Sequence, residues 1–205
     1  MAHGRSSVRN PDSERSRTRR FLSILRHYRS QYAAWEVSGQ RLYRETVLGA
    51  WASSRPEHLY YFFRGIDLSR FKLLVDLGCG DGVVACVASL FTHVVGIEID
   101  ADLCRAGRDA SVVLGLESRV DFICGDFTSQ QITKADCLFV YPDKPLARLE
   151  AILTEAAWRG TLLVYGPHLP PERLKLWDRR SCGRERLVMY TTPSGSGRSA
   201  PGLRP

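Results

Sequence analysis

The sequence has no run of roughly eighteen apolar residues, so no membrane-spanning helix is expected. Its six cysteines include no Cys-x-x-Cys pair, and none stands at metal-ligand spacing from a histidine. Most of them lie within apolar segments, which is typical of reduced, buried thiols. We therefore expect neither a metal site nor a disulfide framework, and the expected compartment is a reducing one, the cytoplasm.

A strong basic excess is also missing from the body of the chain. The formal charge of +7 divides into +4 for residues 1–20, +1 for residues 21–192 and +2 for residues 193–205. Both ends are rich in Arg and Ser and poor in large apolar residues, so both are expected to be disordered. The first lacks the apolar middle of a secretory signal, although import into an organelle stays open. Affinity for a polyanion such as RNA would come mainly from these ends.

Residues 21–192 are expected to form one domain, in which residues 21–65 are helical and residues 71–192 form a sheet. Apolar residues recur at helical spacing in 21–28 and again in 42–51. Pro56 suits the first turn of a third helix, whose segment 58–63 is strongly aromatic. These rings either cover one face of the sheet or line a substrate entrance.

Strand and helix patterns alternate from residue 71 onward, which predicts an α/β, doubly wound, mostly parallel sheet. A turn-like cluster at residues 181–184 then separates two segments that read as an antiparallel hairpin, 174–179 and 185–191. The expected strands before it are 71–77, 93–98, 119–124, 135–141 and 161–165, and the expected helices are 83–91, 101–114 and 146–158.

The most informative segment is the glycine cluster that follows the first of these strands. It reads Gly-x-Gly-x-Gly, and Val83 stands where a dinucleotide-binding loop would have its third glycine. Asp76 and Asp81 bracket the turn and would repel a pyrophosphate. Two carboxylates instead suit a ligand that carries an ammonium and a sulfonium, and S-adenosylmethionine is such a ligand.

Acids also end the next two strands. Glu98 lies twenty residues after Gly78, the spacing at which an acid accepts hydrogen bonds from a ribose diol. Asp126 follows Gly125 and could accept a hydrogen bond from an adenine amino group or serve as a turn residue. Asp100 is expected to cap the helix that begins at residue 101.

With these strand ends, residues 71–193 resemble the class I S-adenosylmethionine-dependent methyltransferases. The resemblance implies a seven-stranded sheet with N-terminal lid helices and a C-terminal antiparallel hairpin. It also implies that Asp76, Gly78 and Gly80 hold the methionine end, Glu98 the ribose and Asp126 the adenine. The residues expected to contact the cofactor are Asp76, Gly78, Cys79, Gly80, Glu98, Ile99, Asp126 and Phe127.

Enzymes of this class present the methyl acceptor at the end of the fourth strand, where this chain has Tyr141-Pro142-Asp143-Lys144. Tyr141 and Asp143 are the expected catalytic residues, because they could orient an amine and accept its proton. The alternative is that this segment is only a rigid turn opening the next helix. His168 is another possible base.

Within this class, the chain also resembles a compact group of protein-lysine methyltransferases found in archaea and mitochondria. It shares Asp-Leu-Gly-x-Gly-Asp-Gly, Gly-x-Glu-x-Asp and Gly-Asp-Phe, here at 76–82, 96–100 and 125–127. This resemblance implies a protein substrate with lysine as the acceptor. Two other hypotheses stay open: an RNA methyltransferase that uses the basic N-terminal segment, and a non-catalytic S-adenosylmethionine-binding domain.

Overall fold

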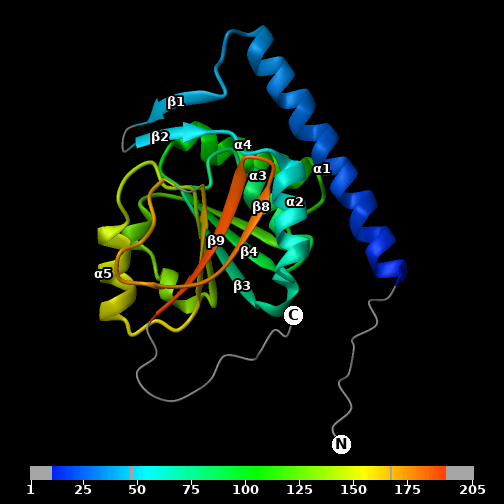
Figure 1. Ribbon diagram of the computed structural model, residues 1–205. Coiled ribbons are helices and arrows are strands. Elements are labelled where there is room, and N and C mark those ends of the chain that lie inside the picture. The colour runs from blue at the N-terminus through cyan, green and yellow to red at the C-terminus, as the bar shows by residue number, and fades with distance from the viewer. Residues whose placement is uncertain (1–10, 47–48, 167, 193–205) are drawn as a thin grey trace, which may run out of the picture.

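The computed structural model describes residues 11–46, 49–166 and 168–192, and its centre is a seven-stranded sheet (Figure 1). The strand order is β5-β4-β3-β6-β7-β9-β8. The first five in this order are parallel, and β9 runs antiparallel to both of its neighbours. The strands are β3 (Leu73–Leu77), β4 (His93–Glu98), β5 (Val120–Cys124), β6 (Cys137–Val140), β7 (Thr161–Tyr165), β8 (Lys175–Cys182) and β9 (Glu185–Thr191). The doubly wound α/β prediction and its closing hairpin are confirmed.

Alternating side chains of the central strands enter two separate cores. In β6, Phe139 packs on one face of the sheet, whereas Leu138 and Val140 pack on the other. All four residues of β6 are buried, as expected for a parallel strand covered on both faces. The helices are α1 (Pro11–Val37), α2 (Pro56–Gly65), α3 (Val83–Ala88), α4 (Ala101–Val113) and α5 (Ala147–Glu155), with 3₁₀ turns η1 (Leu68–Arg70), η2 (Phe127–Ser129) and η3 (Ile132–Lys134).

The helices are divided unequally between the two faces. On the first face, α2 and α3 bury their apolar residues, α4 contributes Ala110, and α1 packs outside α2 and α3. On the second face, α5 supplies Leu149 and Leu153, and η3 supplies Ile132. Phe62 and Phe63 of α2 are fully buried, and Phe63 lies 5.9 Å from Phe139 between ring centroids. The aromatic segment therefore covers the sheet.

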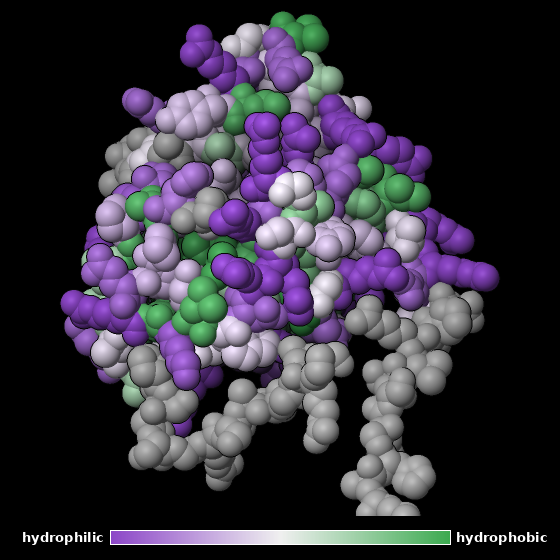
Figure 2. Space-filling view, viewed as in Figure 1, coloured by the Kyte–Doolittle hydropathy of each residue, from purple (hydrophilic) through white to green (hydrophobic). Residues whose placement is uncertain are grey.

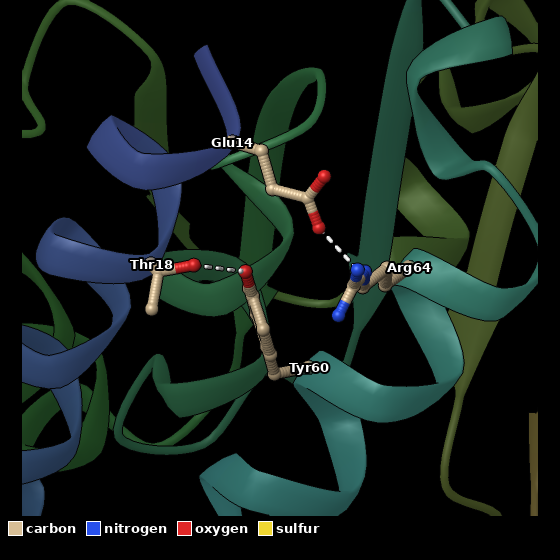
Figure 3. A network of polar contacts seen from close by, with 4 residues as sticks. All are labelled: Glu14, Thr18, Tyr60 and Arg64. Atoms are coloured by element: carbon tan, nitrogen blue, oxygen red, sulfur yellow. Dashed lines mark hydrogen bonds and ion pairs between the residues drawn. The ribbon is translucent and has the colours of Figure 1, made fainter. Parts of the chain in front are cut away.

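The expected disorder of residues 1–20 is wrong for residues 11–20, because α1 begins at Pro11. Contacts with α2 hold this polar segment in the helix: Glu14 forms an ion pair with Arg64, and Thr18 shares a hydrogen bond with Tyr60 (Figure 3). The Arg17 guanidinium also lies 4.8 Å from the centre of the Phe91 ring. Residues 1–10 and the expected tail at 193–205 lie outside the described residues.

The second expected helix, at 42–51, is also wrong. That segment forms an antiparallel hairpin of β1 (Tyr43–Thr46) and β2 (Gly49–Ala52), separate from the main sheet. Trp51 is 8% exposed, whereas Tyr43 is exposed to solvent. The apolar residues of the hairpin had matched a helical period, but the burial of Trp51 against the main domain decides the conformation. The hairpin lies at the end of the molecule where α1 ends (Figure 1).

The described part of the chain contains no helix with the length and apolar character required to cross a bilayer. Figure 2 shows a largely hydrophilic surface along α1, interrupted by small hydrophobic patches.

Candidate functional site

A cavity of about 180 Å³ lies beyond the carboxyl ends of β3, β4 and β6. This is the edge where ligands bind in open parallel sheets. Seven of the predicted site residues line it: Gly78, Glu98, Ile99, Asp126, Phe127, Tyr141 and Asp143. A smaller adjoining cavity of about 20 Å³ is lined by two more of them, Asp76 and Cys79.

The glycine turn between β3 and α3 requires a backbone that other residues rarely adopt. Gly80 has a φ of 55° and Gly82 a φ of 81°. A Cβ at Gly82 would lie 2.9 Å from the Cα of Gly107, so the turn packs directly on α4. A Cβ at Gly80 would lie 2.0 Å from Nε1 of Trp51. The glycines thus serve both the backbone geometry and close packing.

Glu98 ties this turn to the end of β4. The backbone N–H of Gly80 donates to Oε2 of Glu98 at 2.8 Å, and the N–H of Asp100 donates to Oε1 at 2.9 Å. The carboxylate is 6% exposed and borders the cavity. Each of its oxygens can accept a further hydrogen bond, so a ribose diol fits this position.

Asp76 is a buried carboxylate, 2% exposed, at the bottom of the smaller cavity. Within the described residues its Oδ2 has no hydrogen-bond partner. Burial, with the nearby charges of Glu98 and Asp81, raises the pKa of Asp76 well above its usual range. A buried carboxylate without a donor is costly. A cationic ligand such as the ammonium of S-adenosylmethionine would supply that donor.

Asp81 lies behind the glycine turn and is held by α1. The Tyr28 hydroxyl donates to its carbonyl oxygen at 3.1 Å, and Nε2 of Gln31 donates to its Oδ2 at 3.3 Å. Burial raises the pKa of the Asp81 carboxyl to about 7. Asp81 borders the smaller cavity but not the larger one.

Asp126 is the N-cap of η2, which confirms its expected role as a turn residue, and it also borders the larger cavity. Its Oδ1 accepts a hydrogen bond from the N–H of Thr128 at 2.8 Å, and this bond caps the start of η2. The same bond lowers the pKa of the Asp126 carboxyl. The residue also borders the larger cavity, where Arg148 lies 3.9 Å from its Oδ2. Asp100, by contrast, caps α4 through the N–H groups of Asp102 and Leu103, as predicted.

The acceptor side of the cavity is formed by the end of β6 and the segment after it. Tyr141 is 45% exposed, and its ring centroid lies 5.0 Å from that of Tyr165. Burial and the charge of Glu185 raise the pKa of the Tyr141 hydroxyl. Asp143 and Lys144 border the cavity nearby. The N-cap of helix α5 is Leu146, whose side chain makes no cap hydrogen bond.

Comparisons with known proteins agree with this architecture. Residues 57–142 match the model of an O-methyltransferase domain. The chain is 30% identical over 120 residues to a ribosomal protein L11 methyltransferase of Alteromonas mediterranea, covering 57% of this chain and 40% of that protein. An RNA methyltransferase of Salinibacter ruber, solved with S-adenosyl-L-homocysteine, superposes with a TM-score of 0.61 at 22% identity over 72% of this chain and 98% of that one.

Residues 57–142, which match the O-methyltransferase domain, include the glycine turn and Glu98, and the solved methyltransferases share the fold of this chain. The putative methyltransferase yhhF of Escherichia coli has the same fold, with a TM-score of 0.53 at 17% identity over 67% of this chain and 85% of that one. The chain spans 40% of the length of the curated relative from Alteromonas.

The sequence predicted candidate cofactor residues at this edge of the sheet, but it did not predict that the hairpin β1–β2 borders the same cavity. Gly49 and Trp51 of β2 both border the larger cavity. A Cβ at Gly49 would lie 1.8 Å from Oδ2 of Asp143, so the Asp143 side chain occupies the space that a Cβ at residue 49 would need. No motif in the sequence marks these two residues. His168 is exposed and does not border the cavity.

Proposed function

We propose that this methyltransferase transfers the methyl group of S-adenosylmethionine to an amine of a protein side chain, with lysine as the acceptor. The observation that carries this proposal is that Tyr141 and Asp143 both border the acceptor side of the cavity. An aromatic ring and a carboxylate suit an alkylammonium ion, which binds to ring faces and to negative charge. The curated relative is by its name a methyltransferase of a ribosomal protein, which is consistent with a protein acceptor.

The cofactor residues have separate roles in this proposal. Asp76 and the glycine turn with Gly78, Cys79 and Gly80 hold the methionine end. Glu98 and Ile99 hold the ribose, and Asp126 and Phe127 hold the adenine. Positioning of this kind is the main contribution that an enzyme makes to an in-line displacement.

When bound, the cofactor supplies an electrophilic methyl group on a sulfonium that leaves as a neutral thioether. The lysine nitrogen must present its lone pair to that methyl carbon. A new N–C bond forms while the S–C bond breaks, and the electron pair of the broken bond stays on sulfur. Tyr141 orients the amine, and Asp143 accepts the proton that the nitrogen must lose.

A labelling experiment tests the acceptor. The full chain is incubated with methyl-labelled S-adenosylmethionine and cell extract, and the product is treated with protease or with ribonuclease. We expect the label to be lost from the macromolecular fraction with protease only, and acid hydrolysis to release methylated lysine. The Tyr141→Phe and Asp143→Asn variants should label more slowly while still binding the cofactor. Label that is sensitive only to ribonuclease would contradict a protein acceptor.

The second candidate is methylation of RNA, and the surface of α1 favours it. This helix carries six arginines against three acids. Arg15, Arg19 and Arg26 are exposed on it, and Arg17 and Arg20 lie near Arg119 of the segment before β5. Arginine-rich surfaces bind phosphate backbones. The ribonuclease treatment distinguishes this candidate from the first.

A non-catalytic binding domain is the remaining alternative. It predicts that the chain binds S-adenosylmethionine and transfers no label to any component of the extract. For the compartment, we propose a reducing one, since all six cysteines are described as free thiols.

A further inference from the structure

The larger and the smaller cavity meet at three residues. Trp51, Gly78 and Tyr141 border both of them. Glu98 and Asp126 border only the larger cavity, and Asp76 borders only the smaller one. The junction therefore has an aromatic side chain from the hairpin and another from the end of β6.

The proposed function fixes what occupies this junction. In S-adenosylmethionine the sulfonium joins the ribose to the methionine chain. If Glu98 holds the ribose and Asp76 faces the methionine ammonium, the sulfonium must lie between them. The junction of the two cavities is that intermediate position.

The structure holds Trp51 firmly at the junction. Its indole is 8% exposed and packs on the glycine turn, where a Cβ at Gly80 would lie 2.0 Å from its Nε1. Trp35 of α1 contacts it edge-on at 5.9 Å between ring centroids and an angle of 73°. Trp35 in turn contacts Tyr32, and Tyr32 contacts Tyr28. Helix α1 thereby fixes the ring from behind, and a fixed ring loses little freedom when it binds a ligand.

We propose that Trp51 is a cofactor-recognition residue whose ring faces the sulfonium and makes the site prefer the charged methyl donor to its neutral thioether product. This inference rests on the proposed function and goes beyond it. An aromatic face attracts a cation electrostatically, and tryptophan does so most strongly. S-adenosyl-L-homocysteine differs from the donor in lacking the methyl group and the positive charge. Such a preference would promote exchange of product for donor after each turnover.

Calorimetric titration of the full chain with donor and with product tests the proposal. The measured quantity is the ratio of the two dissociation constants, product over donor. In Trp51→Leu, which keeps apolar bulk without a ring, we expect this ratio to fall roughly 3- to 30-fold. In Trp51→Phe the ratio should fall less. Tyr43→Leu is the matched control, because Tyr43 is an aromatic residue of the same hairpin that is exposed, and it should leave the ratio unchanged.

Equal weakening of both ligands in Trp51→Leu would overturn the proposal, because Trp51 would then only cover the site. An unchanged ratio would overturn it as well. If Trp51→Leu does not fold, the calorimetric titration of that variant is replaced by a comparison of tryptophan fluorescence between the wild type and Trp51→Phe. The donor should change the fluorescence more than the product does, and this difference should vanish in Trp51→Phe; a difference that persists would refute the proposal. Failure of the wild type to bind either ligand would contradict the proposed function itself.

Discussion

Asp76 is the residue whose environment is explained best by a ligand. It is buried, its Oδ2 lacks a partner among the described residues, and the charges of Glu98 and Asp81 oppose its ionisation. In the folded protein this buried carboxylate lowers the stability, and in the proposed complex it would meet the ammonium of the cofactor. A group that is unfavourable for folding but favourable for binding is typical of functional sites.

The Asp76→Asn variant separates these two effects. We expect cofactor affinity to fall roughly 10- to 100-fold, because a charge-assisted hydrogen bond to the ligand is lost. The free energy of unfolding should stay the same or increase, because a buried, repelled carboxylate is removed. Calorimetry and urea denaturation measure the two quantities, with the exposed Asp109→Asn as the control. A strong loss of stability without any change in affinity would contradict this role.

Asp81 predicts a pH dependence of stability. Its pKa is about 7 in the folded protein, against an ordinary value of 3.8, because it is buried. Between these pH values the folded protein holds a proton that the unfolded chain has released. This group's contribution to the free energy of unfolding therefore falls as the pH rises from about 4 to about 7 and is constant above that range.

Asp81→Asn should flatten this slope. Urea denaturation of both proteins at several pH values from 4 to 8 measures it, and the difference between the two curves isolates the contribution of Asp81. We expect the variant to gain stability relative to the wild type as the pH rises through this range. A constant difference at every pH would show that the carboxyl ionises normally in the folded state.

At the scale of elements, the hairpin β1–β2 decides how the site is closed. It contacts the glycine turn through Trp51 and the acceptor segment through Gly49. Both contacts are so close that a side chain in place of Gly80 or Gly49 would displace the facing side chain, Trp51 or Asp143, or the hairpin itself. The hairpin thus connects the cofactor side of the cavity with the acceptor side.

Gly49→Ala tests this connection. Its Cβ would lie 1.8 Å from Oδ2 of Asp143, so the Asp143 side chain, the hairpin or the acceptor segment must move. We expect a loss of about 1–3 kcal/mol in the free energy of unfolding, as for other overpacked sites, and weaker cofactor binding. Asp143→Ala in the same chain should restore much of the stability. Gly65→Ala, where the added Cβ meets open space, is the control. Equal stabilities of Gly49→Ala and the wild type would contradict the contact.

The elements also show what the sequence could and could not predict. Residues 71–192 were predictable, because buried parallel strands are mostly apolar, and four of the five here end at or just before a glycine or an acid, β6 being the exception. The position of Glu98 and Asp126 beside one cavity was predictable too, since the carboxyl ends of parallel strands lie at the same edge of a sheet. The N-terminal elements were not predictable in this way. Residues 11–20 form a helix through contacts with α2, and the hairpin forms because Trp51 is buried against Gly80. Helix α2 and Gly80, which these N-terminal segments contact, lie far from them in the sequence, so no local pattern predicts the contacts.

At the scale of the whole molecule, charge is distributed unevenly. The cavity region carries buried acids, whereas α1 carries exposed arginines. The acids of the cavity suit a cationic ligand. The arginines of α1 form a separate surface that suits a polyanion. If RNA forms part of the substrate, whether as the acceptor or as a support for a protein acceptor, α1 is the surface that we expect to bind it.

Replacing Arg15, Arg19 and Arg26 together with alanine tests this surface. We expect weaker RNA binding and a salt dependence whose log–log slope is smaller by about 2 to 3, because three phosphate contacts are lost. Filter binding or fluorescence anisotropy at several salt concentrations measures both. The control is a triple alanine variant of exposed arginines outside α1, at Arg159, Arg173 and Arg184. Identical slopes for the two triple variants would exclude α1 as an RNA-binding surface.

The most direct measurement is a calorimetric titration of the full chain with S-adenosylmethionine, alongside the Glu98→Gln variant. Glu98 joins the glycine turn to β4 and borders the cavity, so the whole cofactor assignment depends on it. The account predicts one bound cofactor per chain and at least roughly tenfold weaker binding in the variant, since charge-assisted hydrogen bonds become neutral ones. No heat of binding in the wild type, or equal affinity in both proteins, would contradict it.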